Sequence, residues 1–237
     1  ELIAADRETV AKRAERAVKM LKSGEKRFAD EAALGEKLLA HLDNLQPART
    51  CPMTDKEREI VREWFLLTTK PVIYACNIKE DDLGKDEDSI PGVTDVKAIA
   101  AGENAKVLVI SAKIEEDIAQ MDDEEKNMFL EELGIGKSGL DRLIAECYDL
   151  LGLISFLTAG ADECRAWTIR KGTKAPQAAG KIHSDFERGF IRAEIVSFND
   201  LKANGSMTAC KEKGLVRSEG KEYVMQDGDV TLFRFNV

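Results

Sequence analysis

Two short apolar runs, about thirty residues apart, are the strongest pattern in this chain. Residues 72–76 and 107–110 are too short for buried helices and suit strands covered on both faces, as in parallel α/β sheets. Each run ends in a polar segment. The two segments are Asn77-Ile78-Lys79-Glu80 and Ser111-Ala112-Lys113. Because parallel strands end at one edge of a sheet, where open α/β sheets bind ligands, we expect the two segments to form a base-binding wall.

The first fifty residues have the periodicity of helices. One apolar seam recurs at helical steps within residues 1–22, and its members are Ile3, Val10, Ala14, Ala17 and Leu21. A second seam lies within residues 28–44 and the residue after them, and its members are Leu34, Leu38, Leu42 and Leu45. Ser23-Gly24 separates the two. The pattern predicts an antiparallel helical hairpin whose charged outer faces project into solvent.

Further helices surround the two apolar runs. Thr54 and Glu57 form a capping-box pattern, and the helix after it carries Ile60, Val61, Trp64, Phe65 and Leu67. Residues 81–91 are acidic and typical of a loop. Helices are also predicted over residues 92–102, 124–133 and 140–151.

The pattern changes near Leu153. Short runs typical of strands now alternate with turns, at residues 154–160, 164–172, 190–198, 221–226 and 229–237. Residues 174–180 are predicted to form a loop of small residues, and residues 198–203 a short helix. Asp227-Gly228 is a turn signal. The pattern predicts a small mixed sheet in a separate C-terminal module.

The bulk composition restricts the class of protein. The chain has 237 residues, 43% of them apolar and 33% charged, which indicates one large or two modest soluble domains. No apolar run reaches the roughly 18 residues that a bilayer crossing requires, so no membrane association is expected. The five cysteines form no C-x-x-C, which favours reduced thiols in a cytoplasmic protein. Since the chain begins at Glu1, without an initiator methionine or a signal peptide, we expect a fragment of a longer protein.

Charge is unevenly distributed along the chain. Residues 1–152 carry 22 Lys and Arg against 33 Asp and Glu, whereas residues 153–237 carry 13 against 11. The basic residues concentrate between residues 165 and 192, and they are Arg165, Arg170, Lys171, Lys174, Lys181, Arg188 and Arg192. A locally basic module on an acidic body fits a partner that carries phosphates, and the alternative is a solvated face with scattered charges.

The N-x-x-E loop differs from the loop that reads guanine. In the Ras-like GTPase fold, the equivalent N-K-x-D loop uses its aspartate to accept from two donors of guanine. Here the carboxylate is Glu80 and position 78 is Ile, so the paired donors of guanine are left unmatched. Each buried polar group without a hydrogen-bond partner costs about 1–3 kcal/mol of binding free energy. Adenine offers an amino donor that Asn77 could accept and a flat face for Ile78. The alternative is a plain turn at the end of a strand.

Longer segments carry a family resemblance. The sequences PVIYACNIKE, VISAKIE and RAWTIRKGTKAPQAAGKIHSDFERGFIRAEI closely resemble the Obg-like ATPases of the YchF type, which are P-loop proteins related to GTPases that prefer ATP. The resemblance covers essentially the whole chain. It implies an α/β fold with three parts: a coiled-coil hairpin over residues 1–50, the C-terminal part of an OBG-type nucleotide domain over 51–152, and a β-grasp TGS domain over 153–237.

The resemblance also implies roles for individual residues. Asn77, Ile78 and Glu80 would recognise the base of ATP, and Ser111, Ala112 and Lys113 would close over it. For Lys113, contact through the side chain and contact through a backbone amide both remain open. The segment from Arg165 to Arg192, with its seven basic residues, would face RNA or the ribosome.

The chain departs from the family pattern in one large respect. It contains no G-x-x-x-x-G-K-[ST], the loop that holds the phosphates and Mg²⁺, and no switch segments or D-x-x-G. The resemblance therefore predicts part of a ribosome-associated ATPase that acts as a nucleotide-controlled switch, and a chain that alone does not hydrolyse ATP. The alternatives are a non-enzymatic RNA- or ribosome-binding module with a vestigial nucleotide site, and an effector domain for a small nucleotide.

Overall fold

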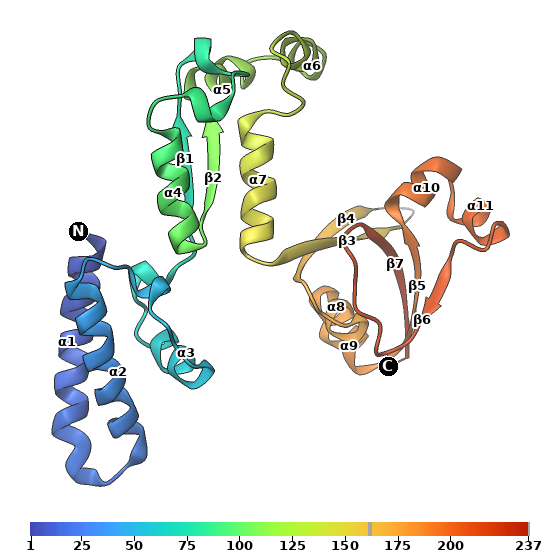
Figure 1. Ribbon diagram of the computed structural model, residues 1–237. Helices are drawn as coiled ribbons and strands as arrows, with labels where there is room; N and C mark the ends of the chain where they lie inside the picture. Colours follow the sequence, from blue (N-terminus) through green and yellow to red (C-terminus); the bar gives the residue numbers. More distant parts are fainter. Residues whose placement is uncertain (161–162, 237) are drawn as a thin grey trace. The chain divides into compact units, whose positions relative to one another are not determined.

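The computed structural model describes residues 1–160 and 163–236, which form two compact units: unit 1, Glu1–Arg142, and unit 2, which begins at Leu143. Figure 1 labels their elements. The helices of unit 1 are α1 (Leu2–Met20), α2 (Lys26–Asp43), α3 (Asp55–Arg62), α4 (Val93–Glu103), α5 (Ala112–Ile118), α6 (Asp123–Glu132) and the start of α7 (Gly139–Leu150). Short 3-10 helices are η1 (Leu21–Ser23), η2 (Ala48–Thr50), η3 (Leu67–Thr69), η4 (Glu80–Asp82) and η5 (Glu87–Ser89). The strands of unit 1 are β1 (Ile73–Asn77) and β2 (Lys106–Ile110).

Helices α1 and α2 lie side by side as an antiparallel pair, at the places that the periodicity predicted (Figure 1). The two helices come close together at Gly35, where an added Cβ would lie 2.6 Å from the Cβ of Ala14. This contact explains why the seam contains small residues. The buried members of the two seams are Val10, Ala17, Leu34, Leu38 and Leu42.

One face of this helix pair is covered, which corrects the expectation of a freely projecting hairpin. Val10, Leu34 and Leu38 share a hydrophobic core with Val61 of α3 and with Trp64. Apolar surface on a narrow seam is stabilised by such a third partner, because two thin helices alone bury little area.

Four apolar residues predicted to lie on helices are exposed instead. Leu21 in η1 and Leu67 in η3 are exposed, Leu45 is 78% exposed, and Phe65 is 83% exposed. Leu45 and Phe65 have φ of 58° and 54°, so each stands where the chain reverses after a helix. The helical pattern was extended past the points at which α2 and α3 end.

The capping box that starts α3 is confirmed. Thr54 Oγ1 accepts a hydrogen bond from the Glu57 amide, and the Glu57 carboxylate accepts from the Thr54 amide at 2.7 Å. The bond from the Thr54 backbone is the main reason why the pKa of Glu57 falls to about 2, and Lys37 contributes as well.

Strands β1 and β2 are parallel and adjacent, as predicted, and α4 connects them. The register pairs Ile73 with Lys106 and Asn77 with Ile110, so both strands end at the same level. On one face, Cys76 packs against a small core that includes Val109. The prediction that β1 is covered on both faces is wrong for the described structure, in which Ala75 is exposed.

Unit 2 contains the rest of α7 and a five-stranded mixed sheet in the order β4-β3-β7-β5-β6. Its strands are β3 (Leu153–Ala159), β4 (Cys164–Arg170), β5 (Phe190–Ser197), β6 (Arg217–Glu219) and β7 (Asp229–Phe235). Its further helices are α8 (Ala175–Ile182), α9 (Ser184–Arg188), α10 (Phe198–Asn204) and α11 (Met207–Glu212). The β3–β7 pair is parallel, and the other pairs are antiparallel, which confirms a small mixed sheet.

Two local predictions in unit 2 are wrong. The predicted loop over residues 174–180 is largely α8, whose residues Ala175, Ala178 and Ala179 are fully buried in the core of the unit. The predicted strand over residues 221–226 makes only an isolated bridge, between Lys174 and Val224, and the strand in this region is β6.

None of the helices in the described part of the chain combines the length and the apolar character that a bilayer crossing requires.

A buried carboxylate in the sheet makes the stability of unit 2 depend on pH. Glu194 on β5 pairs with Arg234 at 3.0 Å and Lys211 at 3.2 Å, and the hydrogen bond from Arg234 is the main reason why its pKa falls from 4.5 to about 2. Because the folded unit binds this proton more weakly than the unfolded chain, the stabilisation is present above pH 4.5 and is lost as the pH falls toward 2.

We therefore expect Glu194→Gln to lower the stability of unit 2 above pH 4.5 and to flatten its loss between pH 4.5 and 2. Urea unfolding followed through the methyl signal of the buried Met225 measures this. Glu212→Gln, which removes an exposed carboxylate from α11, is the matched control. An unchanged pH profile in Glu194→Gln would show that this ion pair does not contribute.

Candidate functional site

The two predicted polar segments meet at the end of the parallel strand pair. The Ile78 amide donates to the Ile110 carbonyl at 2.8 Å, which continues the strand pairing by one residue. The Ala112 amide donates to Oδ1 of Asn77 at 2.9 Å. The side chain of Asn77 therefore joins the segment after β1 to the segment after β2.

Asn77 thus has a positioning contact that the sequence did not reveal. Its Oδ1 is engaged by Ala112 and keeps a second lone pair, and within the described residues no acceptor is bonded to its Nδ2. An amide with a free donor and a remaining acceptor matches the paired N7 and N6 groups of adenine.

Ile78 and Glu80 have different surroundings. Ile78 is half-buried and packs with Cys76 against Ile90, Val93 and Val109, so it anchors the loop to the core. Glu80 is exposed and begins η4, and its carboxylate has no hydrogen bond or ion pair among the described residues. Its acceptor oxygens are therefore open to a ligand.

The second segment places its three residues differently. Ser111 is buried, and its hydroxyl has no hydrogen-bond partner within the described part of the chain. Ala112 is exposed and begins α5, a helix that the sequence did not predict. Lys113 points to its own helix, where Nζ lies 3.2 Å from both Glu116 and Asp117, and the bond to Asp117 chiefly raises its pKa.

The groups present suit a purine base better than phosphates or a metal. Nδ2 of Asn77 and the carboxylate of Glu80 supply a donor and acceptors without partners, whereas the unpaired hydroxyl of Ser111 is buried. Among the described residues, no group of three or more His, Cys, Asp or Glu is arranged to hold a metal ion. Asn77 and Glu80 do not line the hollow beside Met128 on α6 or the hollow beside Trp167 on β4.

Glu115 holds the second segment in place, a role that sequence reasoning missed. Its carboxylate accepts from the amides of Gly139 at 2.6 Å and Leu140 at 3.0 Å, which are the first residues of α7. Arg142 on the same helix donates to the carbonyl of Val109 at 3.2 Å. The contacts span 24 or more positions along the chain, so no local pattern could have indicated them.

In unit 2, the seven predicted basic residues do not form one free surface. Four of them are paired with carboxylates: Lys171 with Asp149, Lys174 with Glu222, Arg188 with Asp185 and Arg192 with Glu194. Arg165, Arg170 and Lys181 have no ion pair among the described residues. These three line one hollow of about 650 Å³ that follows β4 and the adjoining α8.

An aromatic side chain accompanies the three free cations. Trp167 lies in the same hollow, and the guanidinium of Arg165 covers its ring at 4.3 Å from the centroid. The Trp167 indole N–H donates to Thr158 at 2.9 Å, which fixes the ring on the sheet. A cationic hollow with a fixed aromatic platform suits a partner that carries phosphates and flat bases.

With its parallel strand pair, polar carboxyl edge and separate mixed sheet, the chain is an α/β protein of two units. Residues 153–236 match the family model YchF-GTPase_C, "Protein of unknown function (DUF933)". All 237 residues align at 52% identity with "Ribosome-binding ATPase YchF" of Bacillus subtilis (strain 168), and at 43% identity with the protein of that name in Escherichia coli O157:H7. The chain spans 64% of the length of each of these relatives.

Solved structures agree. The Schizosaccharomyces pombe YchF GTPase superposes with a TM-score of 0.82 at 35% identity, over 99% of this chain and 63% of that one. A GTP binding protein from Pyrococcus horikoshii OT3 shares the fold, with a TM-score of 0.56 at 16% identity over 100% of this chain and 69% of that one. The chain is thus strongly similar to YchF proteins over its full length in sequence and in fold, which confirms the predicted resemblance.

The contact between Glu115 and α7 leads to a stability prediction. A Cβ on residue 139 would lie 2.8 Å from Glu115 Oε1 and 2.8 Å from Ile110 Cγ2, so Gly139→Ala forces these two side chains to move and disturbs the bonds of Glu115 to the start of α7. We expect the free energy of unfolding of unit 1 to fall by about 1–3 kcal/mol. Urea unfolding followed through the indole signal of the buried Trp64 measures it.

Gly136→Ala is the control for this experiment, because a Cβ there meets no atom within 4 Å. Equal free energies of unfolding in the two variants would contradict the prediction, because they would show that Ile110 and Glu115 make room for the added methyl group without loss of stability.

Proposed function

We propose that this chain is the base-recognition and ribosome-facing part of a ribosome-associated, ATP-preferring P-loop NTPase that acts as a nucleotide-controlled switch. The observation that carries the proposal is the bond between Asn77 and Ala112, which aligns two polar loops at the end of parallel strands. The names of the relatives, ribosome-binding ATPases, support the same reading. ATP is the nucleotide, and Mg²⁺ accompanies it where a segment with the P-loop is present.

In this proposal the three parts of the chain have separate roles. Residues 1–50 are the coiled-coil hairpin, residues 51–152 the C-terminal part of the OBG-type nucleotide domain, and residues 153–237 the TGS domain. The chain reads the base through Asn77, Ile78 and Glu80 and closes over it with residues 111–113. Without phosphate-binding residues of its own, it does not hydrolyse ATP, and it works in a cytoplasmic setting.

Contacts within unit 1 support a switch, because they connect the helix pair to β1. Asp6 on α1 is buried and accepts from the amides of Leu67 and Thr68 at 2.7 Å each. The Thr68 hydroxyl donates to the same carboxylate at 2.6 Å and accepts from the Ala48 amide at 2.9 Å. Residues 67–69 lead into β1, so a displacement of β1 is transmitted to α1 through these bonds.

A second connection reaches α4. Arg49 donates to the Glu103 carboxylate at 3.1 Å, and the hydroxyl of Tyr74 on β1 donates to the same carboxylate at 2.8 Å. Both ionic side chains are largely shielded from solvent, so breaking the pair leaves an uncompensated charge. The segment after α2, the strand β1 and the helix α4 are therefore connected through one shielded carboxylate.

The base preference can be tested in a polypeptide extended by the proposed phosphate-binding segment. We expect such a protein to bind ATP more tightly than GTP, and Asn77→Ala with Glu80→Ala to reduce the ratio of the two dissociation constants about tenfold, as loss of one or two buried polar contacts implies. Titration calorimetry with ATP and GTP gives both constants.

Two further variants separate base contact from loop support. Glu80→Ala alone leaves the bond between Asn77 and Ala112 in place, so its effect on the ratio reports contact with the base. Asp81→Ala removes an exposed carboxylate from the same 3-10 helix and is the matched control. An unaltered ATP-to-GTP ratio in the double variant would refute the assignment.

The second candidate function is a non-enzymatic RNA- or ribosome-binding module, which the hollow along β4 favours. The three cations of the hollow are free to meet the phosphates of an RNA. The bases of that RNA would stack on Trp167 or on the guanidinium of Arg165. The two functions share this surface and differ in whether nucleotide changes binding.

The surface makes its own prediction. Arg170→Glu with Lys181→Glu reverses two free charges, and we expect about tenfold weaker co-sedimentation with ribosomes and a shallower salt dependence, by about one to two in slope. Lys174→Glu with Arg188→Glu changes the net charge equally but at paired positions, so its effect should be within about twofold. Equal losses in the two pairs would exclude the β4 hollow as the contact.

A further inference from the structure

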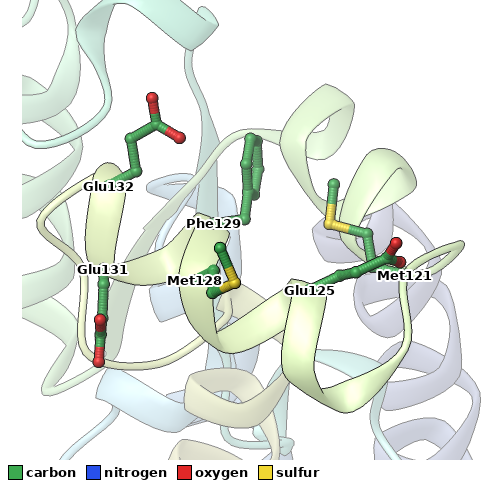
Figure 2. A pocket seen from close by; sticks show the side chains of 6 residues that line it. All are labelled: Met121, Glu125, Met128, Phe129, Glu131 and Glu132. Atoms are coloured by element: carbon green, nitrogen blue, oxygen red, sulfur yellow. The ribbon is translucent and has the colours of Figure 1, made fainter.

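A hollow on unit 1 lies apart from the base-reading loops. It is formed around α6, has a volume of about 630 Å³, and is open to solvent. Its lining consists of three apolar and three acidic side chains: Met121, Met128, Phe129, Glu125, Glu131 and Glu132. Figure 2 shows Glu125 on the Met121 side of the hollow, with Glu131 and Glu132 on the opposite side of Met128.

Helix α6 has an inner and an outer apolar face. On the inner face, Leu130 is buried against Ile114 and Ile118 of α5. The outer face follows helical spacing from Glu125 through Met128 to Glu132. Phe129 lies at its border, since it is half-buried and also packs against the core around Leu130. Met128 is 72% exposed, so its side chain contributes little to the core of the unit.

The charge around this face is negative and unneutralised. Residues 122–132 contain six carboxylates and one base, Lys126, which pairs with Asp141 at 3.1 Å. Asp122 and Glu125 form the capping box of α6, whereas Asp123, Glu124, Glu131 and Glu132 make no ion pair within the described structure.

The position of two of these acids opposes the stability of the helix. Glu131 and Glu132 occupy the last turn of α6, which contains no basic residue. The carboxyl end of a helix carries partial negative charge, so acids there are destabilising by a few tenths of a kcal/mol each. Their placement is therefore not explained by the needs of the helix.

We propose that this hollow docks a basic amphipathic segment of a partner polypeptide. An apolar side chain of the segment packs on Met128 and Phe129, and its lysines or arginines meet Glu125, Glu131 and Glu132. Methionine side chains suit this role because they are flexible and polarizable and adapt to differently shaped partners.

Charge distinguishes this occupant from the other candidates. Nucleic acid is repelled, since its phosphates carry the same sign as the hollow. A second copy of the chain, placed by a two-fold axis, would bring like acids face to face. The proposal is independent of the nucleotide loops and of the basic hollow along β4.

The test is a titration followed by methionine methyl NMR, with a short amphipathic peptide of leucine and lysine as the probe. The chain contains six methionines, and Met20, Met53, Met207 and Met225 serve as internal references. We expect saturable shifts confined to Met121 and Met128. A peptide with serine in place of leucine, at the same charge, should bind at least about fivefold more weakly, since it lacks the apolar anchor.

Two variants separate the acidic rim from the general acidity of the chain. Glu131→Lys with Glu132→Lys should weaken binding at least about tenfold, because like charges then face each other. Glu36→Lys with Glu59→Lys makes the same change at exposed positions on α2 and α3 and should leave binding within about twofold. Met128→Ser, at an exposed site, should reduce affinity about fivefold without loss of folding.

Three results would overturn the proposal. One is the absence of shifts at Met121 and Met128 up to millimolar peptide. Another is equal weakening by the rim and control charge reversals. The third is a shift of these two signals with protein concentration in the absence of peptide, which would identify a second copy as the occupant.

Discussion

The parallel pairing of β1 with β2, closed at its end by the side chain of Asn77, is the constraint on which the candidate site depends. The register sets Asn77 opposite Ile110, and one side-chain oxygen then fixes the first residue of α5. A bond between a side chain and a backbone amide is short and directional, so it transfers the position of one loop to the other. The two loops consequently present their free polar groups as one unit.

Buried charged groups, whose desolvation is unfavourable, fix the start of the same strand. Asp6 is 2% exposed, and a carboxylate in that position is tolerated only because three donors surround it. Arg49 and Glu103 form a second shielded pair beside β1. Charged groups at such positions contribute specificity of arrangement: the helix pair has one position relative to the strand in which every charge is satisfied.

The sequence predicted those elements whose pattern is local. Short apolar runs ending in polar residues identified β1 and β2, and helical seams and the Thr54 capping box identified α1, α2 and α3. It failed where tertiary packing decides. Residues 174–180 lack large apolar side chains and were predicted as a loop, yet Ala175, Ala178 and Ala179 allow α8 to lie close against the sheet.

The candidate site shows the same division. Asn77 and Ser111 could be predicted as candidates because they follow short apolar strands, a position that parallel sheets assign to ligands. Glu115 and Gly139 were missed, since their contact exists only once β2 and α7 are packed together. The engagement of Asn77 by Ala112 likewise could not be derived from spacing, because the two lie 35 positions apart.

The distribution of free charge is also decided by tertiary contacts. Seven basic residues between positions 165 and 192 look equivalent in the sequence, but the fold brings carboxylates to four of them, one from as far as 48 positions away. What remains is a cationic hollow on unit 2 and, by similar reasoning, an anionic one around α6 on unit 1. A partner that senses charge responds to these unpaired groups and not to the net charge of −9, because paired surface charges cancel within about a Debye length of 8–10 Å. The two proposed sites would therefore select for opposite chemistries on the same chain: phosphates along β4, and basic polypeptide at α6.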